Sequence, residues 1–176
     1  IRIPALALNR ATVPTPEQSL SVALSPEDEG RAAARRIRSL GMSTVLLVAS
    51  ADDASLRAAQ ALSLALGQEG GRVLHRIDLP SNSPNYVELI RAAYQQLGWR
   101  ESETTAAPAS AASPSTPVQR RVDVDVVYLA TSGSEARLVI PQLRAEGGLG
   151  TPIMATSQIY AVGANPRLDR DLDGAL

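Results

Sequence analysis

The sequence predicts an α/β protein, a three-layer sandwich in which a mainly parallel sheet carries helices on both faces. Two continuous aliphatic runs of strand length, 44–49 and 127–130, are typical of strands buried on both faces of a parallel sheet. Such strand patterns alternate with amphipathic helix patterns along most of the chain. This alternation favours right-handed crossovers and helix layers on each side of one sheet.

The amino-terminal part predicts two short strands and a well-marked helix start. Apolar segments 5–8 and 20–24 are separated by a polar, Pro-bearing stretch. Ser25 then precedes Pro26, and acidic residues follow, which is the pattern of an N-cap, a first-turn proline and a favourable interaction with the helix dipole. We expect a helix from about residue 26 to residue 40, ended by Gly41.

Two further strand and helix units are expected after it. The strand 44–49 leads into a helix over 53–68, and the strand 72–79 leads into a helix over 85–97. The apolar spacing predicts which side chains of these helices point inward: Leu56, Ala59, Leu62 and Leu66 in the first, and Tyr86, Leu89, Ile90, Ala93 and Leu97 in the second.

The carboxy-terminal part predicts one more such unit. The alternating valines from 122 lead into a strand at 127–130, and a helix that begins between residues 132 and 135 should bury Ala136, Val139, Ile140 and Leu143. Pro141 within that helix should bend it. A strand at 152–155 and a short helix near 168–172 complete the pattern.

The whole chain, 1–176, is expected to form one α/β lobe. Residues 101–118 are rich in Ala, Ser, Thr and Pro and almost free of large apolar residues, so we interpret them as a flexible surface insertion. The chain begins at Ile1, without an initiator Met or a signal sequence, which suggests a piece of a longer protein.

Composition excludes several classes of function. The net charge is -1, every basic residue is Arg, and no basic stripe with aromatic residues occurs, so nucleic acid is not an expected partner. The sequence contains no run of about 18 apolar residues, the length that a helix needs to span a bilayer. The absence of Cys excludes disulfides and thiolate metal sites.

No catalytic or cofactor motif is recognisable. The single histidine, His75, falls inside a predicted strand and is interpreted as structural. Ser132 lies between a strand and a helix, but the pattern G-x-S-x-G of a nucleophile elbow is absent. Glycine-rich nucleotide-binding motifs are also absent. The chain is therefore predicted to be no enzyme and to need no cofactor.

Ser132 and Glu135 have the spacing of a capping box, in which each side chain binds the main chain of the helix's first turn. We favour this structural role. In the alternative interpretation, the free N–H groups and serine hydroxyls of this turn bind a polar or anionic group of a ligand.

The acidic residues favour structural roles as well. Asp169, Asp171 and Asp173 match the first half of a calcium loop, but a short amphipathic helix is the preferred interpretation, so no metal site is predicted. Asp53, next to Asp52, is expected to cap the helix 53–68. Asp123 and Asp125 alternate on a strand and are expected to face solvent.

Ligands of open parallel sheets bind beyond the carboxyl ends of the strands. Those ends lie here at 50–53, 79–82, 131–134 and 156–160. Polar side chains in three of these segments are candidate positions of a ligand cleft: Asp52, Thr131, Ser132, Ser134, Ser157 and Tyr160.

Three segments together resemble a known family. Residues 23–37, 125–143 and 156–166, which begin with ALSPEDEG, DVVYLATSG and TSQIYAVG, are similar to the carboxy-terminal domain of the LppC/LpoA lipoproteins. These are outer-membrane-anchored activators of a class A penicillin-binding protein. The resemblance covers most of the chain in order.

The resemblance implies one lobe of the type I periplasmic-binding-protein fold, with residues 1–20 as the inter-lobe strand and crossover. It implies a non-enzymatic role in the periplasm, where contact with a class A penicillin-binding protein stimulates peptidoglycan synthesis. It leaves peptidoglycan itself open as a second partner. Membrane attachment would come only through a lipid anchor outside this chain.

A second hypothesis remains beside it. The candidate cleft positions could instead belong to the lobe of a solute-binding protein that holds an amino acid, a peptide or a cell-wall fragment.

Overall fold

The computed structural model describes residues 25–81, 83–97, 124–147, 150–160 and 172, and the strand assignment of 5–7 and 19–21. In these parts of the chain the helices are α1 (Pro26–Ser39), α2 (Asp53–Gln68), α3 (Val87–Gln96), α4 (Gly133–Gly147) and the short 3₁₀ helix η1 (Ser157–Ile159). The strands are β1 (Ala5–Ala7), β2 (Ser19–Ser21), β3 (Thr44–Ser50), β4 (Arg72–Leu79), β5 (Val126–Ala130) and β6 (Ile153–Ala155).

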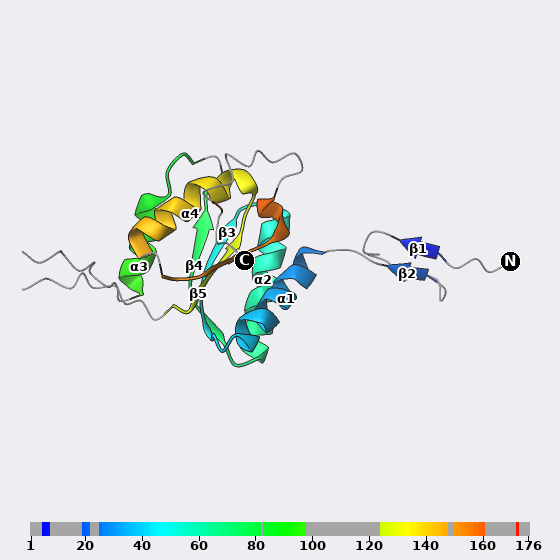
Figure 1. Ribbon diagram of the computed structural model, residues 1–176. Helices are drawn as coiled ribbons and strands as arrows, with labels where there is room; N and C mark the ends of the chain where they lie inside the picture. The colour runs from blue at the N-terminus through cyan, green and yellow to red at the C-terminus, as the bar shows by residue number, and fades with distance from the viewer. Residues whose placement is uncertain are drawn as a thin grey trace, which may run out of the picture.

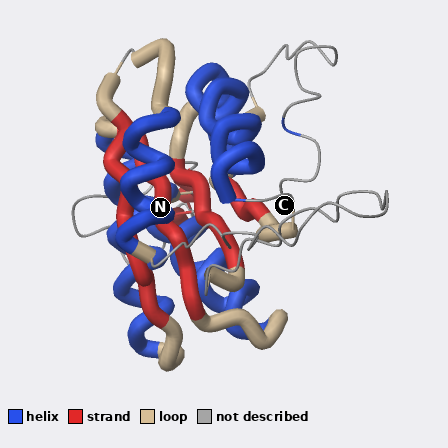
Figure 2. The backbone as a smooth tube through the Cα atoms, turned by 90° about the vertical axis from the view of Figure 1, so that its left-hand side faces the viewer, coloured by secondary structure: helices blue, strands red, loops and turns tan. Residues whose placement is uncertain are grey.

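The main sheet has the strand order β4-β3-β5-β6, and every pair in it is parallel. Helices α1 and α2 cover one face, and α3 and α4 cover the other (Figures 1 and 2). The predicted three-layer α/β/α sandwich is therefore confirmed. β1 and β2 are shorter than the predicted strands and pair with each other, in parallel, as a separate sheet.

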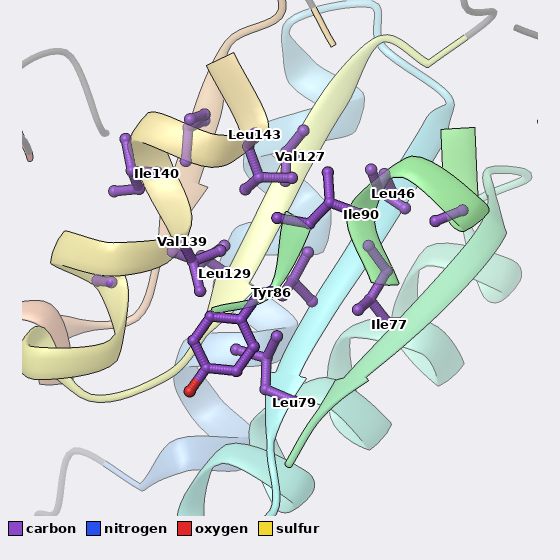
Figure 3. Close-up of a cluster of buried hydrophobic side chains, with 14 of the residues drawn as sticks. Leu46, Ile77, Leu79, Tyr86, Ile90, Val127, Leu129, Val139, Ile140 and Leu143 are labelled. Carbon is purple, nitrogen blue, oxygen red and sulfur yellow. The ribbon is translucent and has the colours of Figure 1, made fainter. Parts of the chain in front are cut away.

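The two central strands are buried on both faces. Six of the seven residues of β3 and all five residues of β5 are buried. Side chains alternate between the layers, so that Val45 and Leu47 pack on α1 and α2, whereas Leu46 and Val127 pack on α3 and α4 (Figure 3). The aliphatic runs of the sequence thus form the centre of the sheet.

Gly30 allows α1 and α2 to pack at close range. A Cβ at this position would collide with the main-chain oxygen of Ala58 and would come within 2.9 Å of the main-chain nitrogen of Leu62. Both atoms belong to the backbone of α2, which cannot rotate away as a flexible side chain would. The helix pair on this face therefore depends on the absence of a side chain at Gly30.

Asp125 attaches the start of β3 to the start of β5. One of its carboxylate oxygens accepts hydrogen bonds from the main-chain N–H of Ser43, at 2.7 Å, and of Thr44, at 2.9 Å. These bonds stabilise the ionised carboxylate and lower the pKa of Asp125, although partial burial opposes them. Asp125 is exposed, as predicted, and has this structural role as well.

The helix predictions were wrong at particular positions. Leu56 is 38% exposed and Leu89 is 42% exposed, although the apolar spacing predicted both to point inward. Asp52, and not Asp53, caps α2, because its carboxylate accepts the main-chain N–H of Ser55 at 2.9 Å. Asp53 pairs with Arg57 on the surface.

The helix predicted to contain Pro141 is α4, which continues through Pro141 with this residue on its exposed side.

Some predictions concern residues that the structure does not describe. Residues 101–118, Asp123 and 168–171 lie outside the described residues, whereas Leu172 is 2% exposed and packs with α3 and α4. Among the described helices, none is long and apolar enough to cross a membrane.

Replacing Gly30 with Ala should destabilise the protein. Overpacking against a backbone costs about 1–3 kcal/mol, which exceeds the gain of about 1 kcal/mol in helix propensity. Gly67→Ala is the matched control, because a Cβ at Gly67 in α2 meets nothing within 4 Å. We expect denaturant unfolding to show a loss for Gly30→Ala and no loss for Gly67→Ala; equal stabilities would contradict the close-packing argument.

Replacing Asp125 with Asn should lower stability at neutral pH by about 1 kcal/mol, because the charge that strengthens two hydrogen bonds is lost. The folded pKa of Asp125 lies below its ordinary value of 3.8, so this stabilisation is present above that value and disappears as the pH falls through the folded pKa. The two proteins should therefore converge in stability in acid. Unfolding curves from neutral pH down to about pH 2 test this, with exposed Asp78→Asn as the control.

Candidate functional site

A cleft of about 640 Å³ lies at the carboxyl ends of β3, β4 and β5. Half of its lining residues carry hydroxyl groups, namely Ser50, Ser81, Ser83, Tyr86, Ser132 and Ser134. Asp52, Glu135, Gln158 and Leu138 contribute the other functional side chains. The volume is in the range of small-molecule sites, and the position is the one where ligands bind in open parallel sheets.

Glu135 is the centre of the hydrogen-bond network in this cleft. One of its carboxylate oxygens accepts the hydroxyls of Ser50 at 2.6 Å, Thr131 at 2.9 Å and Ser132 at 3.0 Å. The hydroxyl oxygens of Ser50 and Thr131 also lie 2.5 Å apart, and since each hydroxyl has one proton, the one that donates to the other does not donate to the carboxylate at the same time. Because Ser50 ends β3 and Thr131 directly follows β5, the carboxylate connects the two central strands to the first turn of α4.

The predicted capping box is present in modified form. The hydroxyl of Ser132 accepts the main-chain N–H of Glu135 at 3.4 Å, as an N-cap does. The Glu135 side chain, however, binds hydroxyl groups, where a capping box would have it bind the main chain of the cap residue. Thus Glu135 both closes the first turn of α4 and forms part of the cleft.

Asp52 brings a second negative charge to the cleft. Partial burial opposes its ionisation, but the hydrogen bonds from Ser55 and from neighbouring main-chain groups outweigh this and lower the pKa of Asp52. Asp52 is therefore ionised at neutral pH. Its carboxylate caps α2 and lines the cleft at the same time.

Tyr86 connects the cleft to the core. Its ring packs beside Leu79 and Leu129, and its hydroxyl points away from that cluster (Figure 3). The side chain is 1% exposed, and the buried hydroxyl has no hydrogen-bond partner. Burial raises the pKa of Tyr86, and the charge of Glu135 adds to the rise, whereas the main chain of Ser83 lies close enough to lower it. Tyr86 therefore joins the core to the lining of the cleft.

The segment around η1 closes one side of the cleft. A Cβ at Gly133 would lie 2.5 Å from the main-chain oxygen of Ile159, so Gly133 permits the close approach of η1 to the start of α4. This approach places Gln158 in the lining. Ser157 turns the other way, and its hydroxyl donates to Glu29 of α1 at 2.6 Å.

The sequence-predicted cleft residues divide into three groups. Asp52, Ser132 and Ser134 line the cleft. Thr131 is fully buried behind it, bonded to Glu135. Ser157 and Tyr160 lie outside the lining; Ser157 binds α1, and Tyr160 is 62% exposed. The site role of all six remains a proposal.

Several residues of the cleft lining were not among the candidate positions predicted from the sequence. Ser50 and Ser81 lie within the predicted strand ends, so their position was a usable signal. Glu135 was interpreted only as a helix cap, and Tyr86 only as a core residue. Gln158 also lies within a predicted strand end, 156–160, so its position was a usable signal as well.

Metal and base chemistry receive no support from the described residues. Within them, no group of three or more His, Asp or Glu side chains could hold a metal ion. Asp169, Asp171 and Asp173 lie outside the described part of the chain. His75 is half-buried in the edge strand β4, outside the cleft lining.

A parallel α/β sandwich with a cleft at the carboxyl ends of its strands has the architecture of an α/β ligand-binding domain. Solved structures agree with this class. The fold matches the carboxy-terminal domain of LpoA from Haemophilus influenzae, a regulator of PBP1A, with a TM-score of 0.61 and 18% identity, covering 98% of this chain and 46% of that one. It also matches a solute-binding protein from R. palustris solved with benzoate, with a TM-score of 0.56 and 16% identity, covering 81% of this chain and 32% of the other.

The chain belongs to the family described as "LppC putative lipoprotein", whose model matches residues 1–176. Among curated relatives, the penicillin-binding protein activator LpoA of Edwardsiella ictaluri (strain 93-146) is 29% identical over 163 residues, 86% of this chain. The same activator of Edwardsiella piscicida is 30% identical over 165 residues. The chain spans 24% of the length of each of these relatives.

Replacing Glu135 with Ala should destabilise the domain by about 1–3 kcal/mol, because three hydroxyl groups lose their common acceptor. Glu135→Gln keeps an oxygen acceptor and should cost less. Thermal and denaturant unfolding measure both. Arg57→Ala, which removes surface ion pairs with Asp53 and Glu27, is the control and should cost under about 1 kcal/mol. A Glu135→Ala protein as stable as the wild type would contradict a structural role for the network.

Proposed function

We propose that this chain is an α/β lobe of an outer-membrane-anchored periplasmic lipoprotein that activates a class A penicillin-binding protein by protein contact. The family match over the whole chain carries the proposal, because the curated relatives are activators and not enzymes. The LpoA carboxy-terminal domain, a regulator of PBP1A, supplies the same fold over nearly the whole chain.

The geometry of the cleft is compatible with a role that involves no catalysis. The two carboxylates of the described cleft lining are engaged in structural contacts: Asp52 caps α2, and Glu135 accepts hydroxyl groups. Histidine, the commonest general acid and base of enzymes, is absent from this part of the lining. The lobe therefore acts in the proposal through its surface and its binding cleft.

The proposal is tested with the intact lipoprotein and the class A synthase of the same organism. The two proteins should co-purify, and the lipoprotein should raise the rate of glycan polymerisation by the synthase. A solute-binding protein of similar fold, added at equal concentration, is the control and should do neither. Failure of the lipoprotein both to bind and to stimulate would overturn the proposal.

A second candidate function is the binding of a small solute in the cleft. The unpartnered Tyr86 hydroxyl favours it, because a buried polar group without a partner costs free energy that a ligand can recover. The match to a solute-binding protein shows that the fold accommodates this function. The two functions are compatible, because binding would use the cleft and activation would use a protein surface.

A further inference from the structure

The charge of the cleft indicates which ligand it would accept. Asp52 and Glu135 contribute two carboxylates, and no arginine lines the part of the cleft that the structure describes. Each carboxylate lies at a helix N-terminus, and such an end carries about half a positive charge, so the two helix ends offset about one of the two negative charges. About one negative charge remains, and it favours a cation over an anion.

The position of the Glu135 carboxylate is fixed before any ligand arrives. Its hydrogen bonds to Ser50, Thr131 and Ser132 come from three segments and hold one oxygen in place. Among the described residues, no hydrogen bond to its other oxygen is formed. A charged acceptor with a fixed orientation binds a donor with little loss of side-chain entropy. A protonated amine is the donor that gains most from such an acceptor.

Two further features of the lining define the rest of the ligand. The Tyr86 hydroxyl, buried and unpartnered, can donate to an oxygen of the ligand or accept from its N–H. Leu138 is 42% exposed at the rim and offers an apolar surface. Together they fit a small molecule that has an amine, a neighbouring polar group and a short aliphatic part.

We propose that the cleft binds a small ligand through a protonated amine, with Glu135 as the acceptor of the ammonium group and the Tyr86 hydroxyl as a second polar contact. The inference rests on the second proposed function, solute binding in the cleft. It adds the chemical class of the ligand and the two residues that select it.

The test uses the intact protein and three probes that share one aliphatic side chain: leucinamide, which is a cation, leucine, which is a zwitterion, and N-acetyl-leucine, which is an anion without an amine. Calorimetric titration and ligand-observed NMR at neutral pH should show the tightest binding for leucinamide and none for N-acetyl-leucine. Preferential binding of N-acetyl-leucine would overturn the amine assignment while leaving solute binding intact.

Three variants test the residues. Glu135→Gln should weaken leucinamide binding roughly tenfold or more, because a charge-assisted hydrogen bond is lost. Tyr86→Phe should weaken it roughly threefold to tenfold without lowering the melting temperature, since its hydroxyl has no partner in the free protein. Asp53→Asn is the matched control: it removes a carboxylate next to Asp52 that does not line the cleft, and binding should stay unchanged.

The outcomes distinguish this inference from the proposals on which it rests. Unchanged affinity in both Glu135→Gln and Tyr86→Phe would overturn the residue assignment even if leucinamide binds. An equal loss in Asp53→Asn would show a general effect of charge and would also overturn it. Absence of binding by all three probes would overturn the inference, and stimulation of the synthase by the same protein would show that the activator proposal stands independently.

Discussion

The burial of β3 and β5 on both faces is the constraint on which the rest of this structure depends. Strands without a solvent face need a helix layer on each side, so α1 and α2 must cover one face and α3 and α4 the other. Because the strands are parallel, their carboxyl ends meet at one edge. Ser50 and Thr131 come together there for this reason, 81 residues apart in the sequence.

Several residues at that edge serve the fold and the cleft together. Glu135 closes the first turn of α4 and connects β3 to β5. Asp52 caps α2 and also lines the cleft. Tyr86 places a ring in the core and a hydroxyl at the cleft. Such shared use means that these side chains are held by the same contacts that hold the layers together.

The fold by itself does not decide between the proposed functions. A regulator of PBP1A and a solute-binding protein both share it with this chain at identities below 20%. Membership of the LppC family favours activation, and the unpartnered Tyr86 hydroxyl favours a ligand. In the two proposals, a small molecule would occupy the cleft and the synthase would contact the outer surface of the lobe.

Local patterns were sufficient to predict the three layers, because aliphatic runs and helix periodicity are properties of a few neighbouring residues. They also predicted the Ser25 cap, whose hydroxyl accepts the main-chain N–H of Asp28. They did not place Leu56 and Leu89, since only the packing of each helix on the sheet decides the limits of its buried face. The cleft required the tertiary structure: the contacts of Ser157 with Glu29 and of Glu135 with Ser50 join residues 128 and 85 positions apart, and no local pattern encodes which distant side chain a carboxylate will meet.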